Sequence, residues 1–222
     1  MIDDIVDFLF PKRCAGCGAY GKDLCSKCLD GLEIADQVCP ECGEESSMGW
    51  THSGCKKEGQ MDGLIVIYDF QDPKVKEIIN EIKFGFNRRL VVEMLKNFVF
   101  ETGVEFNYLV PVPLYFYRHN WRGFNQAEEI AEVTKKKLRG TKLNALVRVK
   151  NTKQQSMLSS REDREKNIKG AFEIDAVAKK RLVGKKVLLI DDVFTSGADM
   201  RECTKMLKKA GVSIVWGLAL AH

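Results

Sequence analysis

The sequence predicts an α/β protein with a mainly parallel β-sheet flanked by helices, preceded by a small cysteine-rich module. Two observations support this prediction. From residue 61 onward, apolar stretches of strand length alternate with helical patterns, an order typical of βαβ units. Before that point the chain is rich in cysteine, with seven of its eight cysteines between positions 14 and 55. We therefore expect a zinc-binding module at residues 1–60 and an α/β domain at residues 61–222.

The composition is that of an ordinary soluble protein, with 222 residues, 45% hydrophobic and 30% charged. No apolar run approaches the roughly 18 residues of a membrane span. The N-terminus is acidic where a signal peptide is basic. We expect a cytoplasmic protein without membrane insertion.

Charge is divided unevenly along the chain. Residues 1–60 carry 6 Lys and Arg against 11 Asp and Glu, whereas residues 61–222 carry 29 against 20. A basic second part favours phosphate groups, on a small molecule or on nucleic acid. The charge alone does not choose between them.

Four pairs of metal-ligand residues share one spacing, with two residues between the members of each pair. They are Cys14 and Cys17, Cys25 and Cys28, Cys39 and Cys42, and His52 and Cys55. Two such turns complete a tetrahedral zinc site, so eight ligands predict two Zn²⁺ ions with no open position for water. These are structural sites, and the metals supply much of the folding energy of this segment. A disulfide scaffold is disfavoured in the cytoplasm. The spacing permits both consecutive and interleaved pairing of the turns.

The first half of the α/β domain begins with an apolar strand at 63–70. A helix follows at 73–86, where apolar residues recur at helical spacing. A second helix is predicted over 88–103, ending at the glycine. The stretch 107–114 is a strand interrupted by prolines at its end.

The second half continues the alternation. A helix at 125–140 stops at Gly140, and short strands follow at 144–150 and 171–174. The stretch 151–170 between them is polar and has no clean period. The remaining elements are a strand at 186–193, a helix at 198–211 and a closing strand at 212–222. Cys203 lies in this last helix and is expected to be a core thiol.

The stretch VLLIDDVFTSGADM, residues 187–200, contains the main candidate site. Its strand brings Asp191 and Asp192 to the carboxyl end of the sheet, where open α/β sheets bind ligands. A turn of hydroxyls and glycine then enters a helix, whose N-terminus attracts phosphate. Gly197 lets the backbone approach that phosphate closely. The carboxylates can hold ribose hydroxyls directly or through Mg²⁺. We expect a sugar 5-phosphate here.

This stretch resembles the PRPP-binding loop of type I phosphoribosyltransferases. The resemblance implies that Asp191 and Asp192 are the catalytic carboxylates that hold the ribose. It also implies that the 5-phosphate lies on the turn, at Thr195, Ser196, Gly197, Ala198 and Asp199. The last of these departs from the pattern, because Thr or Ser is common there and a carboxylate repels phosphate. Asp199 is therefore expected to point away and cap the helix.

The resemblance extends to the ComF family and its GntX-like relatives over the whole chain. It is carried by VPVPLYFYRHNWRGFNQAEEIA (110–131), QQSMLSSREDREKNIKGAF (154–172) and NEIKFGFNRRL (80–90), together with the cysteine-rich head. It implies a zinc module followed by a type I phosphoribosyltransferase-like domain. It further implies a link to competence, the handling of incoming single-stranded DNA in natural transformation, or to the use of DNA as a nutrient.

Further site candidates lie in loops that follow the predicted strands and helices. Arg118, Arg122 and Asn125 are candidates for pyrophosphate or DNA, since the corresponding loop of a phosphoribosyltransferase binds pyrophosphate. Asn125 is equally suited to capping the helix, with Glu128 completing a capping box. Lys83 is a fourth candidate. The polar stretch 151–170 matches a mobile loop over the substrate, with Arg148 among the cations assigned to it.

Three functions remain open from the sequence. In the first, the protein binds single-stranded DNA, because aromatic residues lie among cations. These aromatics are Phe84, Phe86, Tyr115, Phe116, Tyr117 and Trp121. Such interleaving suits base stacking along a phosphate track. The alternative is an active phosphoribosyltransferase that uses PRPP and Mg²⁺ on an unknown base or nucleotide acceptor. In the third, the acidic zinc head docks another DNA-uptake protein.

Overall fold

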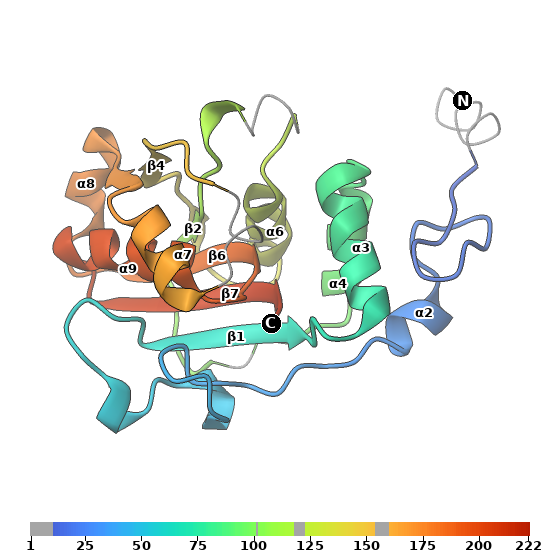
Figure 1. Ribbon diagram of the computed structural model, residues 1–222, viewed down its shortest axis with the longest axis horizontal. Coiled ribbons are helices and arrows are strands. Elements are labelled where there is room, and N and C mark those ends of the chain that lie inside the picture. Colours follow the sequence, from blue (N-terminus) through green and yellow to red (C-terminus); the bar gives the residue numbers. More distant parts are fainter. Residues whose placement is uncertain (1–10, 101, 118–122, 154–159) are drawn as a thin grey trace.

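The fold is built around a five-stranded sheet of order β1-β7-β6-β2-β3, in which every pairing is parallel. The computed structural model describes residues 11–100, 102–117, 123–153 and 160–222 (Figure 1). The strands are β1 (Gly63–Tyr68), β2 (Tyr108–Pro111), β3 (Thr141–Lys142), β6 (Lys186–Val193) and β7 (Ile214–Ala221). The expected fold class, a mainly parallel sheet flanked by helices after a cysteine-rich segment, is confirmed.

Helices cover both faces of this sheet. On one face lie α3 (Pro73–Phe84), α4 (Arg89–Leu95) and α6 (Gln126–Lys135). On the other lie α8 (Ala176–Leu182) and α9 (Ala198–Lys209), with α7 (Arg161–Ile168) packed against α9. A separate antiparallel pair, β4 (Leu146–Arg148) and β5 (Phe172–Ile174), sits beside α9. None of the helices described is long and apolar enough to cross a membrane.

The central strands are buried on both sides, which explains their unbroken apolar sequences. In β1, Ile65 and Ile67 face the core under α3, whereas Leu64 and Val66 face the core under α9. The same alternation runs through β6 and β7. Cys203 is fully buried in the α9 core, as expected for a structural thiol.

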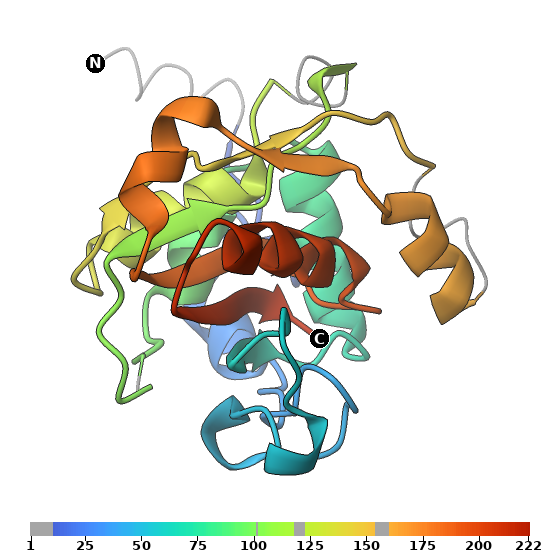
Figure 2. The same cartoon turned by 90° about the vertical axis from the view of Figure 1, so that its left-hand side faces the viewer.

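The cysteine-rich segment covers the free edge of β1 (Figure 2). It includes α2 (Ser26–Asp30) and two short 3₁₀ turns, η1 (Ser47–Gly49) and η2 (Ser53–Cys55). Antiparallel bridges join Ile34 to Tyr68 and Trp50 to Gly63. The Gln37 side chain also bonds to both backbone groups of Val66, at 3.2 and 2.7 Å. A covered edge cannot pair with another chain.

The predicted helix over 88–103 is wrong in its second half. Helix α4 ends at Leu95. Beyond it, Phe98 and Phe100 are half-buried and pack edge to face at 4.9 Å, while Val99 between them is exposed. This alternation is that of an extended chain. Burial of two phenylalanines on one side therefore outweighs the helical pattern.

Within the described part of residues 61–222, three elements are present that the sequence did not predict. The polar stretch 151–170 contains α7, whose N-cap Ser160 accepts a hydrogen bond from the Asp163 N–H. Asp175 caps α8 in the same way. The third is β3, two residues at the edge of the sheet. Short or wholly polar elements show little hydrophobic periodicity. The capping residues of the two helices were therefore the sequence features that could have predicted them.

Candidate functional site

The two carboxylates lie where the sequence placed them, at the carboxyl end of β6. Asp191 pairs in register with Ala219 of β7, and both aspartates are half-buried. The Asp192 N–H donates to Asp191 Oδ1 at 2.9 Å. Lys83, at the end of α3, approaches from the other side, with its Nζ 3.3 Å from Asp192 Oδ1. The structure thus brings Lys83, a distant sequence candidate, to the acidic pair.

The Asp191 carboxyl group strongly resists ionisation. Its desolvation, and then the negative charges of Asp192 and Asp199, raise the pKa of Asp191 well above its usual value. The Asp192 N–H and the Lys83 ammonium act in the opposite direction but do not offset this. Donors such as ribose hydroxyls, or a cation, would relieve the same crowding of charge.

The turn at residues 195–198, which the sequence predicts to bind phosphate and which we call the phosphate turn, leads directly into α9. Thr195 is exposed, Ser196 half-buried, and Gly197 and Ala198 buried. Gly197 takes a left-handed conformation, with φ 67°. A Cβ at this position would lie 2.4 Å from the Phe194 ring, so only glycine fits without rearrangement.

Asp199 is neutralised by a buried cation. Arg148 Nη1 donates to Asp199 Oδ1 at 3.0 Å, and Nη2 donates to the Thr152 hydroxyl at 2.6 Å. The guanidinium also lies 5.1 Å from the centre of the Phe172 ring. Arg148 lies at the end of β4, within the strand predicted at 144–150, and its burial corrects only its assignment to the cations of the following loop. Only the fold brings it to Asp199, 51 positions away.

Asn125 serves as the cap of α6. Its side-chain oxygen accepts from the Ala127 N–H at 3.1 Å, and its amide donates to the Val112 carbonyl at 2.9 Å. The residue is buried, so these bonds tie the end of β2 to the helix. The Glu128 carboxylate lies 3.9 Å from Lys142 Nζ. Arg118, Arg122 and Trp121 lie outside the described residues.

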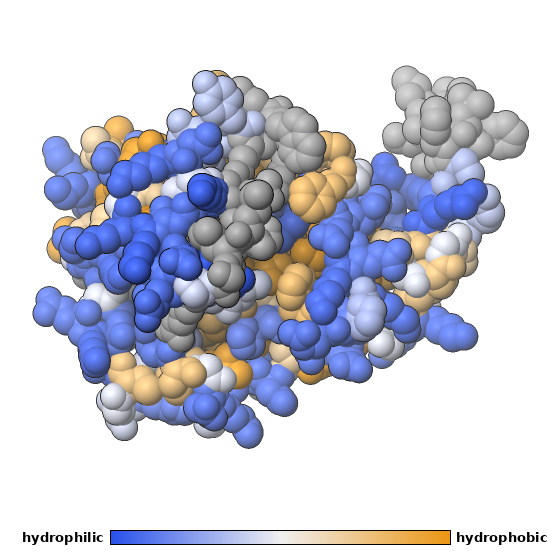
Figure 3. Space-filling view, viewed as in Figure 1, coloured by the Kyte–Doolittle hydropathy of each residue, from blue (hydrophilic) through white to orange (hydrophobic). Residues whose placement is uncertain are grey.

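Exposed aromatic side chains lie beside α3 and in the loop after β2. Phe116 and Tyr117 are 66% and 67% exposed, and Phe84 and Phe86 are about half exposed. Hydrophobic side chains are visible at the surface next to α3 (Figure 3). Phe86 has φ 58°, an unusual conformation for a bulky residue, and its ring meets Phe124 edge to face at 6.5 Å. The Arg88 guanidinium lies 4.5 Å from the centre of the Phe124 ring.

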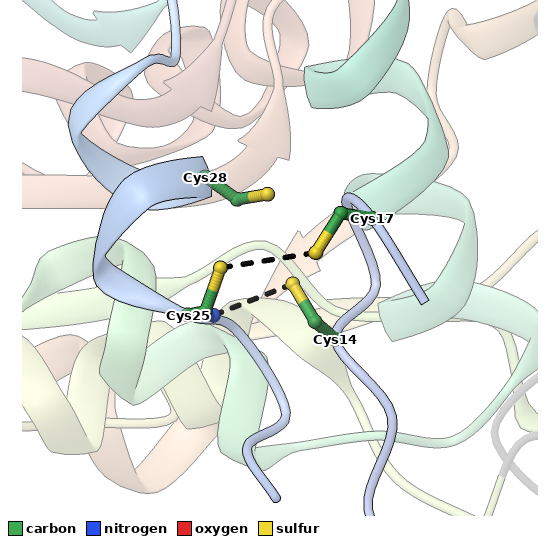
Figure 4. Close-up of side chains that lie close together, drawn as sticks. All are labelled: Cys14, Cys17, Cys25 and Cys28. Carbon is green, nitrogen blue, oxygen red and sulfur yellow. Dashed lines mark hydrogen bonds between the residues drawn. The ribbon is translucent and has the colours of Figure 1, made fainter. Parts of the chain in front are cut away.

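The first set of metal ligands comprises Cys14, Cys17, Cys25 and Cys28, whose sulfur atoms lie within 4.8 Å of one another (Figure 4). Cys17 and Cys25 sulfurs are 3.9 Å apart, close to the edge of about 3.8 Å of a tetrahedron with zinc–sulfur bonds of about 2.3 Å. Burial alone would raise the pKa of Cys14, but backbone N–H groups, led by that of Cys25, lower it to about 6. The thiolate that binds metal is therefore favoured.

The second set comprises Cys39, Cys42, His52 and Cys55, also within 4.8 Å of one another. His52 Nδ1 is 3.4 Å from the Cys42 sulfur, as expected for neighbouring ligands of one ion. Its Nε2 lies 3.1 Å from the Glu45 carbonyl, which accepts a hydrogen bond from the protonated Nε2 and leaves Nδ1 for the metal. Of the two pairings left open by the spacing, the structure has the consecutive one.

Comparison with known proteins agrees with this organisation. Residues 5–58 match the double zinc ribbon domain. The chain is similar to Competence protein F of Haemophilus influenzae, with 34% identity over 211 residues, 89% of this chain and 90% of the relative. It is also similar to DNA utilization protein YhgH of Escherichia coli, with 26% identity over 86% of this chain and 87% of the relative.

Two solved structures match part of this chain. Glutamine phosphoribosylpyrophosphate amidotransferase from B. subtilis matches with 21% identity and a TM-score of 0.34, over 54% of this chain and 23% of that one. A structure described as the allosteric regulatory enzyme of purine biosynthesis matches with 20% identity and a TM-score of 0.36, over 60% and 25%.

Proposed function

Because the chain belongs to the ComF family of competence and DNA-utilization proteins, we propose that it binds single-stranded DNA and handles it during natural transformation. The observation that carries this proposal is the exposure of four aromatic side chains, two at the end of α3 and just after it and two after β2: Phe84, Phe86, Phe116 and Tyr117. Aromatic rings exposed at a surface offer flat apolar faces for stacking. Every base has a π-face, so such a surface accepts bases without regard to sequence.

Cations accompany these rings. Lys83 lies on the same helix end as Phe84, and Arg88 stacks on Phe124 while its Nη2 donates to the Gly123 carbonyl at 3.3 Å. A strand of DNA crossing this surface would place its phosphates near both cations. Phe86 supports the same interpretation, because a strained backbone that presents a ring to solvent is typical of a binding site.

The test is a titration of a fluorescent oligothymidine at two salt concentrations. We expect the double variant Phe116→Ala/Tyr117→Ala to bind at least about tenfold more weakly, since stacking contributes about 1–3 kcal/mol per base. Affinity should fall as salt rises, because phosphate contacts release counterions. Tyr20→Ala, which removes an equally exposed tyrosine from the cysteine-rich segment, is the matched control. Equal binding by wild type and the double variant would refute this surface.

A sugar-phosphate pocket at Asp191 and the phosphate turn is the second part of the proposal. The carboxylates, the left-handed Gly197 and the start of α9 support it, since they offer acceptors for a diol and N–H groups for a phosphate. The ion pair between Arg148 and Asp199 removes the objection that a free carboxylate would repel the phosphate.

The same geometry favours an active PRPP-dependent phosphoribosyltransferase as the alternative function. Asp191 and Asp192 would hold Mg²⁺ and the ribose, and the metal would neutralise the leaving pyrophosphate. Lys83, 3.3 Å from Asp192, keeps one carboxylate paired with a positive charge. Calorimetry with PRPP and Mg²⁺ should show binding to wild type and loss of binding in Asp191→Asn/Asp192→Asn. Equal binding by both proteins would exclude this site.

A further inference from the structure

Arg201 joins two parts of the molecule that are far apart in the sequence. It lies in the first turn of α9, and its Nη1 donates to the Ser196 carbonyl of the phosphate turn. Its Nη2 donates to the Pro40 carbonyl of the cysteine-rich segment, 161 positions away. One guanidinium thus bonds to the turn on one side and to the zinc module on the other.

The zinc-module side of this link belongs to the second metal site. Pro40 and Glu41 are the two residues between the ligands Cys39 and Cys42. The Glu41 carboxylate lies 3.4 Å from Arg201 Nε, and the two side chains are only 9% and 12% exposed. A metal held by Cys39 and Cys42 would determine the path of the backbone between them. It would thereby determine the positions of the Pro40 carbonyl and the Glu41 carboxylate, which are the partners of Arg201.

On the other side, Arg201 packs into the turn itself. Its guanidinium lies 5.6 Å from the centre of the Phe194 ring. A Cβ on Gly197 would lie 3.1 Å from Nη1, so the glycine also makes room for the arginine. In a trans peptide the carbonyl and the following N–H point in opposite directions. Holding the Ser196 carbonyl toward Arg201 therefore turns the Gly197 N–H away, to the opposite side of the turn.

We propose that Arg201 is a positioning residue that transmits the shape of the second zinc site to the phosphate turn. All the N–H groups of the turn then face an anion only when the second site, formed by Cys39, Cys42, His52 and Cys55, has its metal bound. This inference rests on the proposed sugar-phosphate pocket and assigns that pocket a dependence on the zinc module. A merely structural tie would lower global stability but leave the turn unchanged in the folded protein.

Amide hydrogen exchange of residues 193–200, read by mass spectrometry, tests this link directly. In Arg201→Gln we expect exchange of this segment to speed up about tenfold, with zinc content unchanged at two ions per chain. Ribose 5-phosphate affinity, measured by calorimetry, should fall by a similar factor. Lys205→Gln, which removes a cation one turn further along α9, is the matched control and should change neither quantity. Unchanged exchange in Arg201→Gln would overturn the proposal.

A second comparison tests the dependence on the metal site. Cys42→Ser should speed up exchange of residues 193–200 in the wild-type background, but add little in the Arg201→Gln background, because the link is already broken. Fully additive effects would contradict the proposal. If Arg201→Gln does not fold, Arg201→Lys gives the same comparison, since lysine keeps the charge but lacks the planar fork. If wild type binds no ribose 5-phosphate, the pocket fails, while the exchange results still decide on the link.

Discussion

Arg148 and Asp199 show how one residue can depart from a family pattern without destroying a site. Asp199 lies where a hydroxyl is common, and sequence alone suggested that its carboxylate points away as a helix cap. It instead pairs at 3.0 Å with an arginine that is buried in β4. No local pattern could reveal this, because the partner is 51 residues away and its charge was assigned to the polar loop that follows its strand.

Substitution of Arg148 should therefore lower the stability of the folded protein. Arg148→Gln leaves Asp199 without its cation in a half-buried position, and we expect a loss of about 2 kcal/mol in the free energy of unfolding. Denaturation with urea measures this. Adding Asp199→Asn to Arg148→Gln should restore much of the loss, because the unpaired charge is then gone. Additive losses in the double variant would contradict the ion pair.

Asp191 gives a prediction about pH. Its folded pKa is raised, so the folded protein holds a proton that the unfolded chain releases near pH 4. Stability should fall as pH rises from about 4 toward the folded pKa. Asp191→Asn removes this effect, so its melting temperature should exceed that of wild type by a few degrees at pH 7 and match it below about pH 4. Asp192→Asn, which loses the Lys83 ion pair, is the control. A destabilised Asp191→Asn at pH 7 would contradict the account.

Among the helices and strands, the sequence predicted the bounds best for those that are long and buried. The strand at 186–193 has the bounds predicted, because an apolar run ending in two carboxylates suits only a central strand. The helix at 88–103 failed because Phe98 and Phe100 gain more from burial on one side of an extended chain. The aspartates, Lys83 and the zinc ligands were found as candidates. Arg148 and Arg201 were not found as candidates for this site, because only tertiary contacts bring their side chains to it.

The edge of β1 depends on the zinc module. Its covering segment, residues 34–50, contains the metal ligands Cys39 and Cys42 and lies between Cys28 of the first metal site and His52 of the second. Chelation of zinc should therefore open residues 34–50 and expose β1. We expect protection against hydrogen exchange to be lost over 63–68, while 186–193 in the centre of the sheet stays protected. Retained protection over 63–68 after complete zinc removal would show that the segment folds without metal.

At the scale of the whole molecule, the cysteine-rich segment touches the candidate site from two sides. The second metal site reaches the phosphate turn through Arg201. Near the first metal site, Asp23 accepts a hydrogen bond at 2.9 Å from Asn87, in the loop that follows Lys83 and carries Phe86. The candidate site thus lies between two contacts with the cysteine-rich segment. The sequence predicted a separate head and domain, but could not show this arrangement because none of its contacts is local.

We propose that single-stranded DNA binds across the exposed aromatic residues after α3 and β2. Ultraviolet crosslinking of an oligothymidine to the zinc-loaded protein, followed by mass-spectrometric mapping, tests it most directly. We expect crosslinks at Phe84, Phe86, Phe116 or Tyr117, and their loss at high salt. Crosslinks confined to the opposite side of the sheet, around α8, would contradict it.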